Sequence, residues 1–238
     1  MSEIGFGPRG GANPAAATQA GQPVVPQQGA ASVTDAPPVV SVRSLPAGIA
    51  DPGPLGLAGF ALTTFVLSVF NAQLVDTPKL VDVFLPAALF YGGIAQLLAG
   101  MWEFRKDNTF GAVAFTSYGA FWMGLAAYVW LVEPKLSASG PNAGKTGLGI
   151  YLGAFTLFTL YMWVASLRTN AAVAATFTIL LVTFVLLTFG NFNPDTKLVE
   201  IGGWFGIFTA GAAWYASAAG VANSTFGKTL LPTYPLKK

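Results

Sequence analysis

Six long stretches of apolar residues, almost free of charge, occupy the chain from residue 55 to residue 221. A helix needs roughly 20 mostly apolar residues to cross the hydrocarbon core of a bilayer. Charged residues make up only 9% of the chain and fall between these stretches, as they must where lipid offers no water to solvate them. We therefore predict an all-α membrane protein, a bundle of six transmembrane helices. The predicted spans are residues 55–75, 83–102, 110–132, 148–167, 171–190 and 201–221.

The first 46 residues have a different composition. They hold seven of the sixteen prolines, many alanines, glycines and glutamines, and a single aromatic residue, Phe6. Such a segment cannot bury enough apolar surface to offset its ordering entropy. We predict a disordered cytoplasmic tail over residues 1–46, a six-helix membrane domain over 47–232 and a short basic tail over 233–238.

The distribution of lysine and arginine predicts the orientation. With a cytoplasmic N-terminus, the segments inside the cell carry eight of the twelve basic residues, and all four arginines are among them. Cytoplasmic loops are enriched in these residues. We expect both termini to be cytoplasmic.

Composition excludes several function classes. The chain has no cysteine and no histidine, which removes disulfides, thiol chemistry and the usual ligands of zinc, haem and iron–sulfur clusters. It has no catalytic constellation, no phosphate-binding glycine loop and no basic patch with interleaved aromatic residues. We predict no enzymatic activity, no metal, no cofactor and no nucleic-acid partner.

Uncharged polar residues recur at membrane depth on single helix faces. Residues 60, 63, 64, 67 and 71 share one face of the first span, and residues 176, 180, 183, 187 and 191 share one face of the fifth. The candidate polar residues are Thr63, Thr64, Asn71, Gln96, Asn108, Thr109, Thr183 and Asn191. They either bond helices to one another or line a path. A path lined by N–H and O–H donors suits a small carboxylate, which only accepts hydrogen bonds.

Several motifs resemble the acetate uptake transporter family. Residues 51–60 read DPGPLGLAGF, which resembles the family signature Asn-Pro-Ala-Pro-Leu-Gly-Leu-x-Gly-Phe. Further matches are FYGGIAQ at 90–96, NTFG at 108–111, FTSYGAFW at 115–122 and GN at 190–191. The resemblance covers about residues 51–232. It places Asp51, Pro52, Pro54, Leu55 and Gly56 in the signature, with Asp51 standing where the family has asparagine; we expect Asp51 to cap the first helix.

The resemblance implies a protein of the plasma membrane, which in a bacterium is the inner membrane. It also implies an assembly that is often a hexamer, with one substrate path in each subunit. It implies transport of acetate and possibly succinate, by proton symport or as an anion channel. It also matches Phe60, Tyr118 and Leu180 to the family's hydrophobic constriction. The alternative function is a membrane sensor of acetate, or a scaffold, without transport.

Overall fold

The computed structural model describes residues 48–75, 82–140 and 142–236. In this part of the chain, six continuous helices are long and apolar enough to cross a membrane, which confirms the predicted fold class. The predicted tail, residues 1–46, lies outside the described residues. The elements are α1 (Gly53–Asn71), α2 (Phe84–Pro86), η2 (Ala87–Ala95), α3 (Gln96–Arg105), α4 (Thr109–Ala127), η3 (Tyr128–Val132), α5 (Glu133–Ser139), α6 (Ala143–Ser166), α7 (Ala171–Phe192) and α8 (Thr196–Phe226).

Short polar side chains begin three of the long helices. Asn108 Oδ1 accepts a hydrogen bond from Gly111 N at the start of α4, and Asn170 Oδ1 accepts one from Val173 N at the start of α7. Asp195 Oδ1 accepts two, from the first backbone N–H groups of α8. These caps satisfy donors that have no partner within the helix.

The connection between the predicted spans 110–132 and 148–167 is shorter than those spans imply. The third span continues through η3 into α5, which ends at Ser139, and α6 begins at Ala143. Pro134 lies directly after η3 inside this continuous helix, where it has no N–H to donate to the preceding turn. Ser137 Oγ donates to Glu133 Oε1 at 2.8 Å, one turn away. Polar residues thus extend this helix beyond its apolar part.

Glu103, which follows the predicted second span directly, lies inside the second long helix and is buried. The second long helix runs to Arg105, and Glu103 is only 1% exposed within it. Asn108 Nδ2 donates to Glu103 Oε2 at 2.7 Å. The buried carboxylate is therefore paired with an amide from the start of the next helix, as a buried charge requires.

The second span contains a wide turn of π-helix, η2. Its glycines let α1 and α4 approach it closely: a Cβ on Gly92 would lie 2.8 Å from Thr63 Cβ and 3.0 Å from Trp122 Cδ1. Thr63 Oγ1 donates to Ala87 O at 3.2 Å, at the first residue of η2. π-Helical turns are rare and occur frequently at functional sites.

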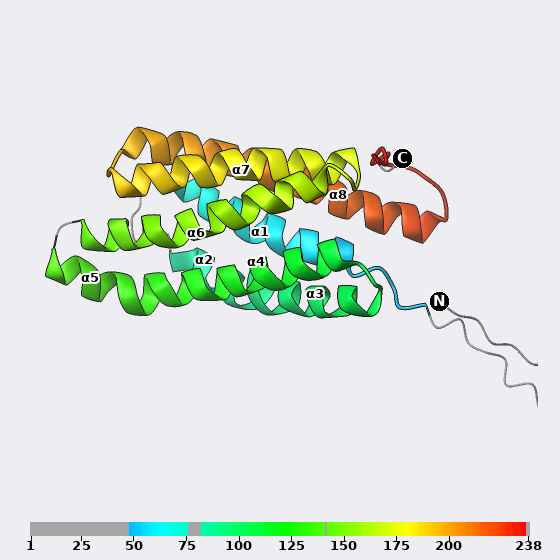
Figure 1. Ribbon diagram of the computed structural model, residues 1–238, viewed down its shortest axis with the longest axis horizontal. Coiled ribbons are helices and arrows are strands. Elements are labelled where there is room, and N and C mark those ends of the chain that lie inside the picture. Colours follow the sequence, from blue (N-terminus) through cyan, green and yellow to red (C-terminus); the bar gives the residue numbers. More distant parts are fainter. Residues whose placement is uncertain (1–47, 76–81, 141, 237–238) are drawn as a thin grey trace, which may run out of the picture. The chain divides into compact units, whose positions relative to one another are not determined.

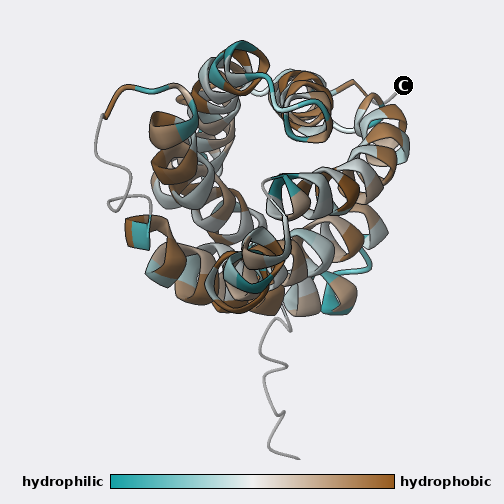
Figure 2. Ribbon diagram, turned by 90° about the vertical axis from the view of Figure 1, so that its left-hand side faces the viewer, coloured by the Kyte–Doolittle hydropathy of each residue, from teal (hydrophilic) through white to brown (hydrophobic). Residues whose placement is uncertain are grey.

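The long helices pack side by side in one bundle (Figure 1). Helix α8 lies against α1 and α7, α6 lies against α7, and α3 lies against α4. Seen along the helices, they surround a common axis (Figure 2). Aromatic and aliphatic side chains from several helices fill the interior, with Tyr118 and Phe121 of α4 at the centre of a set of ring contacts.

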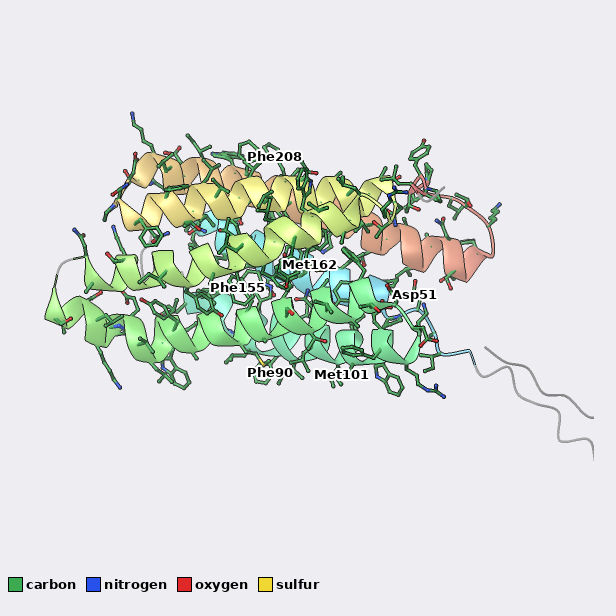
Figure 3. All side chains as sticks on the ribbon, viewed as in Figure 1. Asp51, Phe90, Met101, Phe155, Met162 and Phe208 are labelled. Carbon is green, nitrogen blue, oxygen red and sulfur yellow. The ribbon has the colours of Figure 1, made fainter. Side chains whose placement is uncertain are left out.

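Large apolar side chains cover the outside of the bundle. Phe90, Met101 and Phe208 point away from it (Figure 3), and each is more than half exposed. A surface of this kind is stable in contact with lipid or with other apolar helices rather than with water. Asp51 lies at the opposite end of the bundle from α5.

Candidate functional site

Three helices, α1, α4 and α7, run in the same direction along the inside of the bundle. The residues at their starts, Gly53, Asn108 and Asn170, line one cavity. Near their far ends, Asn71, Leu125 and Asn191 line another. Residues at equal distances from the helix starts therefore lie at similar depths, and each depth can be read as one layer.

The cavity at the helix starts, here called the Asp51 vestibule, has a volume of about 470 Å³. Asp51, Glu103 and Asn108 give its wall a polar, acidic sector. Lys106 Nζ lies 2.9 Å from Asp51 Oδ1 and offsets one of the two carboxylates. Thr233 and Pro235 contribute to the wall from the C-terminal segment.

The cavity at the far ends, here called the Asn191 cavity, has a volume of about 130 Å³. Its wall is mostly apolar. The polar side chains on it that the sequence predicted are Thr64, Asn71, Thr183 and Asn191. Leu67 and Leu187, from the same predicted helix faces, lie there too.

Between the two cavities lies an apolar ring, here defined as Phe60, Tyr118 and Leu180. All three are at most 5% exposed, and the Phe60 and Tyr118 rings are 5.6 Å apart. The ring borders a small void of about 20 Å³, whose wall also contains Gln96. Phe60 and Leu180 face both the void and the Asn191 cavity. Leu57 and Phe177 face both the void and the Asp51 vestibule. The three spaces therefore follow one another through the bundle.

The hydroxyl of Tyr118 is already paired. It lies 2.8 Å from Thr159 Oγ1, and Thr159 gives its own proton to Phe155 O at 2.7 Å. Because Thr159 has a single proton, Tyr118 is the donor of the shared bond. Tyr118 thus presents its ring, not a free O–H, to the small void.

The predicted polar residues differ in the hydrogen-bond partners of their side chains. Thr63 turns to η2 and lies on none of the three cavities described above. Thr183 Oγ1 donates to Ile179 O, and Asn191 Nδ2 donates to Leu187 O at 2.8 Å. Each of these two side chains therefore bonds to a carbonyl of its own helix and also lines the Asn191 cavity.

Two residues predicted together at the start of the third span have different positions. Asn108 lies on the wall of the Asp51 vestibule, where it caps α4 and holds Glu103. Thr109, the first residue of α4, is exposed and lies on none of the three cavities described above. Helical spacing alone could not separate them, because both stand at a helix start.

The signature residues lock the start of α1 to its neighbours. Pro54 O accepts a hydrogen bond from Ser217 Oγ of α8 at 2.7 Å. Gly56 lies against the Phe115 ring of α4, so that a Cβ there would lie 2.6 Å from it. Pro52 O accepts the bond from Gly56 N, and Leu55 faces outward. These contacts fix the start of α1 against α4 and α8.

Asp51 does not occupy the N-cap position that we predicted. Pro52 does, and Asp51 Oδ1 accepts from Gly53 N at 3.2 Å from one residue earlier. The physical reason is the proline: it continues the helical backbone conformation, which moves the carboxylate out to where it also meets Lys106.

Some residues that line the Asn191 cavity or hold the apolar ring carry no polar signal in the sequence and were missed. Phe184 and Trp122 line the Asn191 cavity, and Thr159 holds Tyr118 from α6. Trp122 stands inside a motif that matched the family, four residues after Tyr118, which is the one signal that could have pointed to it.

Comparison with known proteins gives consistent matches. A model described as the GPR1/FUN34/yaaH family matches residues 37–238. The chain is 42% identical over 185 residues to the "Succinate-acetate/proton symporter SatP" of Escherichia coli K12, covering 77% of this chain and 95% of that protein. It is also 42% identical over 176 residues to "Ammonia transport outward protein 2" of Saccharomyces cerevisiae, covering 73% of this chain and 62% of that protein.

One solved structure matches closely. It is described as the bacterial acetate channel SatP, has a TM-score of 0.70 and 39% sequence identity, and covers 78% of this chain and 99% of that chain. The six-helix arrangement described above therefore matches one found in a structure of a membrane channel.

Proposed function

This chain belongs to the GPR1/FUN34/yaaH family, and we propose that it moves acetate and related small carboxylates across a membrane. The substrate class is supported by the similarity to a protein named for succinate, acetate and protons and to a structure named for acetate. These neighbours are a symporter and a channel, which agrees with the absence of a catalytic constellation from the sequence.

The observation that carries the proposal is the line of three spaces interrupted by the apolar ring. A constriction of buried apolar side chains excludes hydrated inorganic ions, because entering it costs them their water. Acetate has a methyl group that suits such a ring and a carboxylate that accepts bonds from donors beside it. No fixed cation lies on the wall of the Asn191 cavity among the described residues, so binding there is weak enough for release.

The cellular setting follows the same proposal. The protein works in the plasma membrane, which is the inner membrane in a bacterium, with both termini in the cytoplasm. It assembles as a hexamer with one path in each subunit. The outward-facing apolar residues, including Phe90 and Phe208, supply surface for lipid and for neighbouring subunits. The similarity to a succinate-acetate/proton symporter supports succinate as a second substrate and proton symport as one mode of transport, and the similarity to an acetate channel supports an anion channel as the other.

Uptake of labelled acetate into liposomes that contain only this protein tests the proposal. We expect saturable uptake well above that of empty liposomes. Leu180→Trp should block it by filling the apolar ring. Leu157→Trp makes the same change on an outward face, where residue 157 is 68% exposed, and should leave uptake intact. Uptake no greater than in empty liposomes would support the alternative, a sensor or scaffold.

A further inference from the structure

The last helix is followed by a segment that turns back to the bundle. Helix α8 ends at Phe226, and Gly227 follows it with a φ of 64°. The segment then returns to the start of α7 (Figure 1). Its residues 230–236 are here called the C-terminal strap. Thr233 and Pro235 of the strap lie on the wall of the Asp51 vestibule, together with residues from the starts of α1, α4 and α7.

Backbone hydrogen bonds tie the strap to the start of α7. Ala171 N donates to Tyr234 O at 2.9 Å, and Leu236 N donates to Thr169 O at 2.9 Å. The N–H of Ala171 is one of the donors at a helix start that have no partner within the helix. Ala171 is partly exposed, so water can replace the strap as the partner of this donor.

Two polar side chains of α8 hold the other half of the strap. Asn223 makes three hydrogen bonds with the backbone of Leu230 and Leu231. Tyr215 donates its hydroxyl to Pro232 O at 2.7 Å. None of the described residues of the strap belongs to the buried hydrophobic core. The strap is therefore held by hydrogen bonds near the surface and not by burial of apolar side chains.

Tyr234 holds the strap in a strained conformation. Its φ of 52° lies in the left-handed region, which a bulky residue rarely adopts. The Tyr234 side chain is 66% exposed, so its own burial does not offset the strain. A segment with few buried apolar contacts opens at low free energy while the core stays folded. The start of α7 keeps its cap when the strap leaves, because Asn170 Oδ1 accepts from Val173 N.

We propose that the C-terminal strap is a gate on the Asp51 vestibule, an inference that rests on the proposed transport function. In its bound position, the strap places Thr233 and Pro235 in the vestibule wall and slows the entry of the carboxylate. When the strap detaches, both side chains leave the wall, the vestibule widens, and the substrate reaches the apolar ring more often. The rate of transport therefore follows the fraction of molecules whose strap is detached.

A reversible cross-link tests the gate in a chain that has no cysteine. Asn170 and Pro235 face each other as an antiparallel bridge between the two backbone bonds of the strap to α7. Residues in such a pair have Cα atoms about 4.5 Å apart, which suits a disulfide. In liposomes that contain Asn170→Cys/Pro235→Cys, oxidation should lower the initial rate of acetate uptake, and dithiothreitol should restore it. The unmodified chain and Asn170→Cys alone should respond to neither reagent.

A substitution that loosens the strap should have the opposite effect. Tyr215→Phe deletes the bond to Pro232 O at a residue that lies on none of the three cavities described above. The loss of one net hydrogen bond should raise the detached fraction about fivefold. Faster hydrogen exchange at the Leu236 amide measures this change, and the initial rate of acetate uptake should rise with it. Tyr161→Phe, at an exposed tyrosine of α6, is the matched control.

These outcomes separate the two proposals. If the unmodified protein shows no uptake, the transport function itself fails. If it transports acetate, but the cross-linked variant does so equally fast when oxidised and when reduced, transport stands and the gate is wrong. Faster exchange at Leu236 in Tyr215→Phe without faster uptake would overturn the gate as well. Two cysteines that do not cross-link under an oxidant would show that the strap is not paired with α7.

Discussion

At the scale of single residues, the apolar ring is built from side chains that have no hydrogen bond to offer. The Tyr118 hydroxyl is hydrogen-bonded to Thr159, so Tyr118 contributes only its aromatic ring to the wall. In the proposed function, the ring limits passage by size and by the loss of water, while recognition of the substrate falls to the residues on either side of it.

Tyr118→Phe should accordingly leave acetate uptake nearly unchanged and lower stability instead. The substitution keeps the ring and deletes a buried bond, at a cost of about 1 kcal/mol. Thermal unfolding in detergent measures the loss, and liposome uptake at matched protein density measures the flux. A large fall in flux at unchanged stability would mean that the hydroxyl contacts the substrate.

Glu103 is the one carboxylate buried inside a long helix within the described residues, and it faces the Asp51 vestibule. Glu103→Gln keeps the acceptor for Asn108 Nδ2, so the fold should survive. We expect the variant to lose the stimulation of acetate uptake by an inward proton gradient but to keep acetate exchange at equal pH, because exchange needs no net proton movement. Glu133→Gln, at a partly exposed carboxylate that does not line the vestibule, is the control. Equal stimulation of uptake in both variants would show that Glu103 takes no part in proton coupling.

Adjacent residues show how far prediction from sequence can reach. Helical spacing correctly grouped Thr64, Leu67 and Asn71, since the period of a helix determines which side chains share a face. It also grouped Thr63 with them, but Thr63 turns to Ala87 O because η2 brings that carbonyl within reach. The partner of a polar side chain depends on neighbouring helices, and no local pattern encodes it.

At the scale of elements, the segment after α8 is tied to the start of α7. Ala171 N donates to Tyr234 O at 2.9 Å, and Leu236 N donates to Thr169 O at 2.9 Å. Asn223 holds the segment from the other side through bonds with Leu230 and Leu231. Thr233 and Pro235 of the predicted tail over 233–238 are thus part of the vestibule wall, and no periodicity in the sequence indicates it.

Asn223→Ala should loosen this segment without unfolding the bundle, because it removes three hydrogen bonds at the end of α8. Hydrogen exchange should speed up at residues 230–236 and at the backbone amide of Ala171, and remain slow in the middle of α7. Asn193→Ala, at an exposed asparagine beyond the end of α7, is the matched control. Unchanged exchange at residues 230–236 would show that the segment is held by other contacts.

At the scale of the whole molecule, the six spans could be predicted because burial in lipid dictates their composition. Their ends could not, since a helix extends beyond the bilayer wherever caps and polar side chains support it. The last helix is predicted over 201–221 but runs from Thr196 to Phe226, begun by Asp195 and ended at Gly227 in the left-handed conformation.

The orientation in the membrane is a prediction for the whole molecule. Ser139 and Lys228 are exposed near opposite ends of the bundle, in a chain without cysteine. An impermeant thiol reagent applied to intact cells should label Ser139→Cys and spare Lys228→Cys until the membrane is opened, because the lysine and arginine bias places the C-terminus inside. The opposite labelling pattern would invert the topology.

The π-helical turn η2 also has a consequence for how this protein can change in evolution. A wide turn of this kind holds an extra residue relative to an α-helix. Losing one residue from it would rotate all that follows by about 100°. Gln96 and Glu103, which lie after η2, would then leave the path and the vestibule together. Insertions and deletions should therefore be rarer in η2 than in the turns between helices.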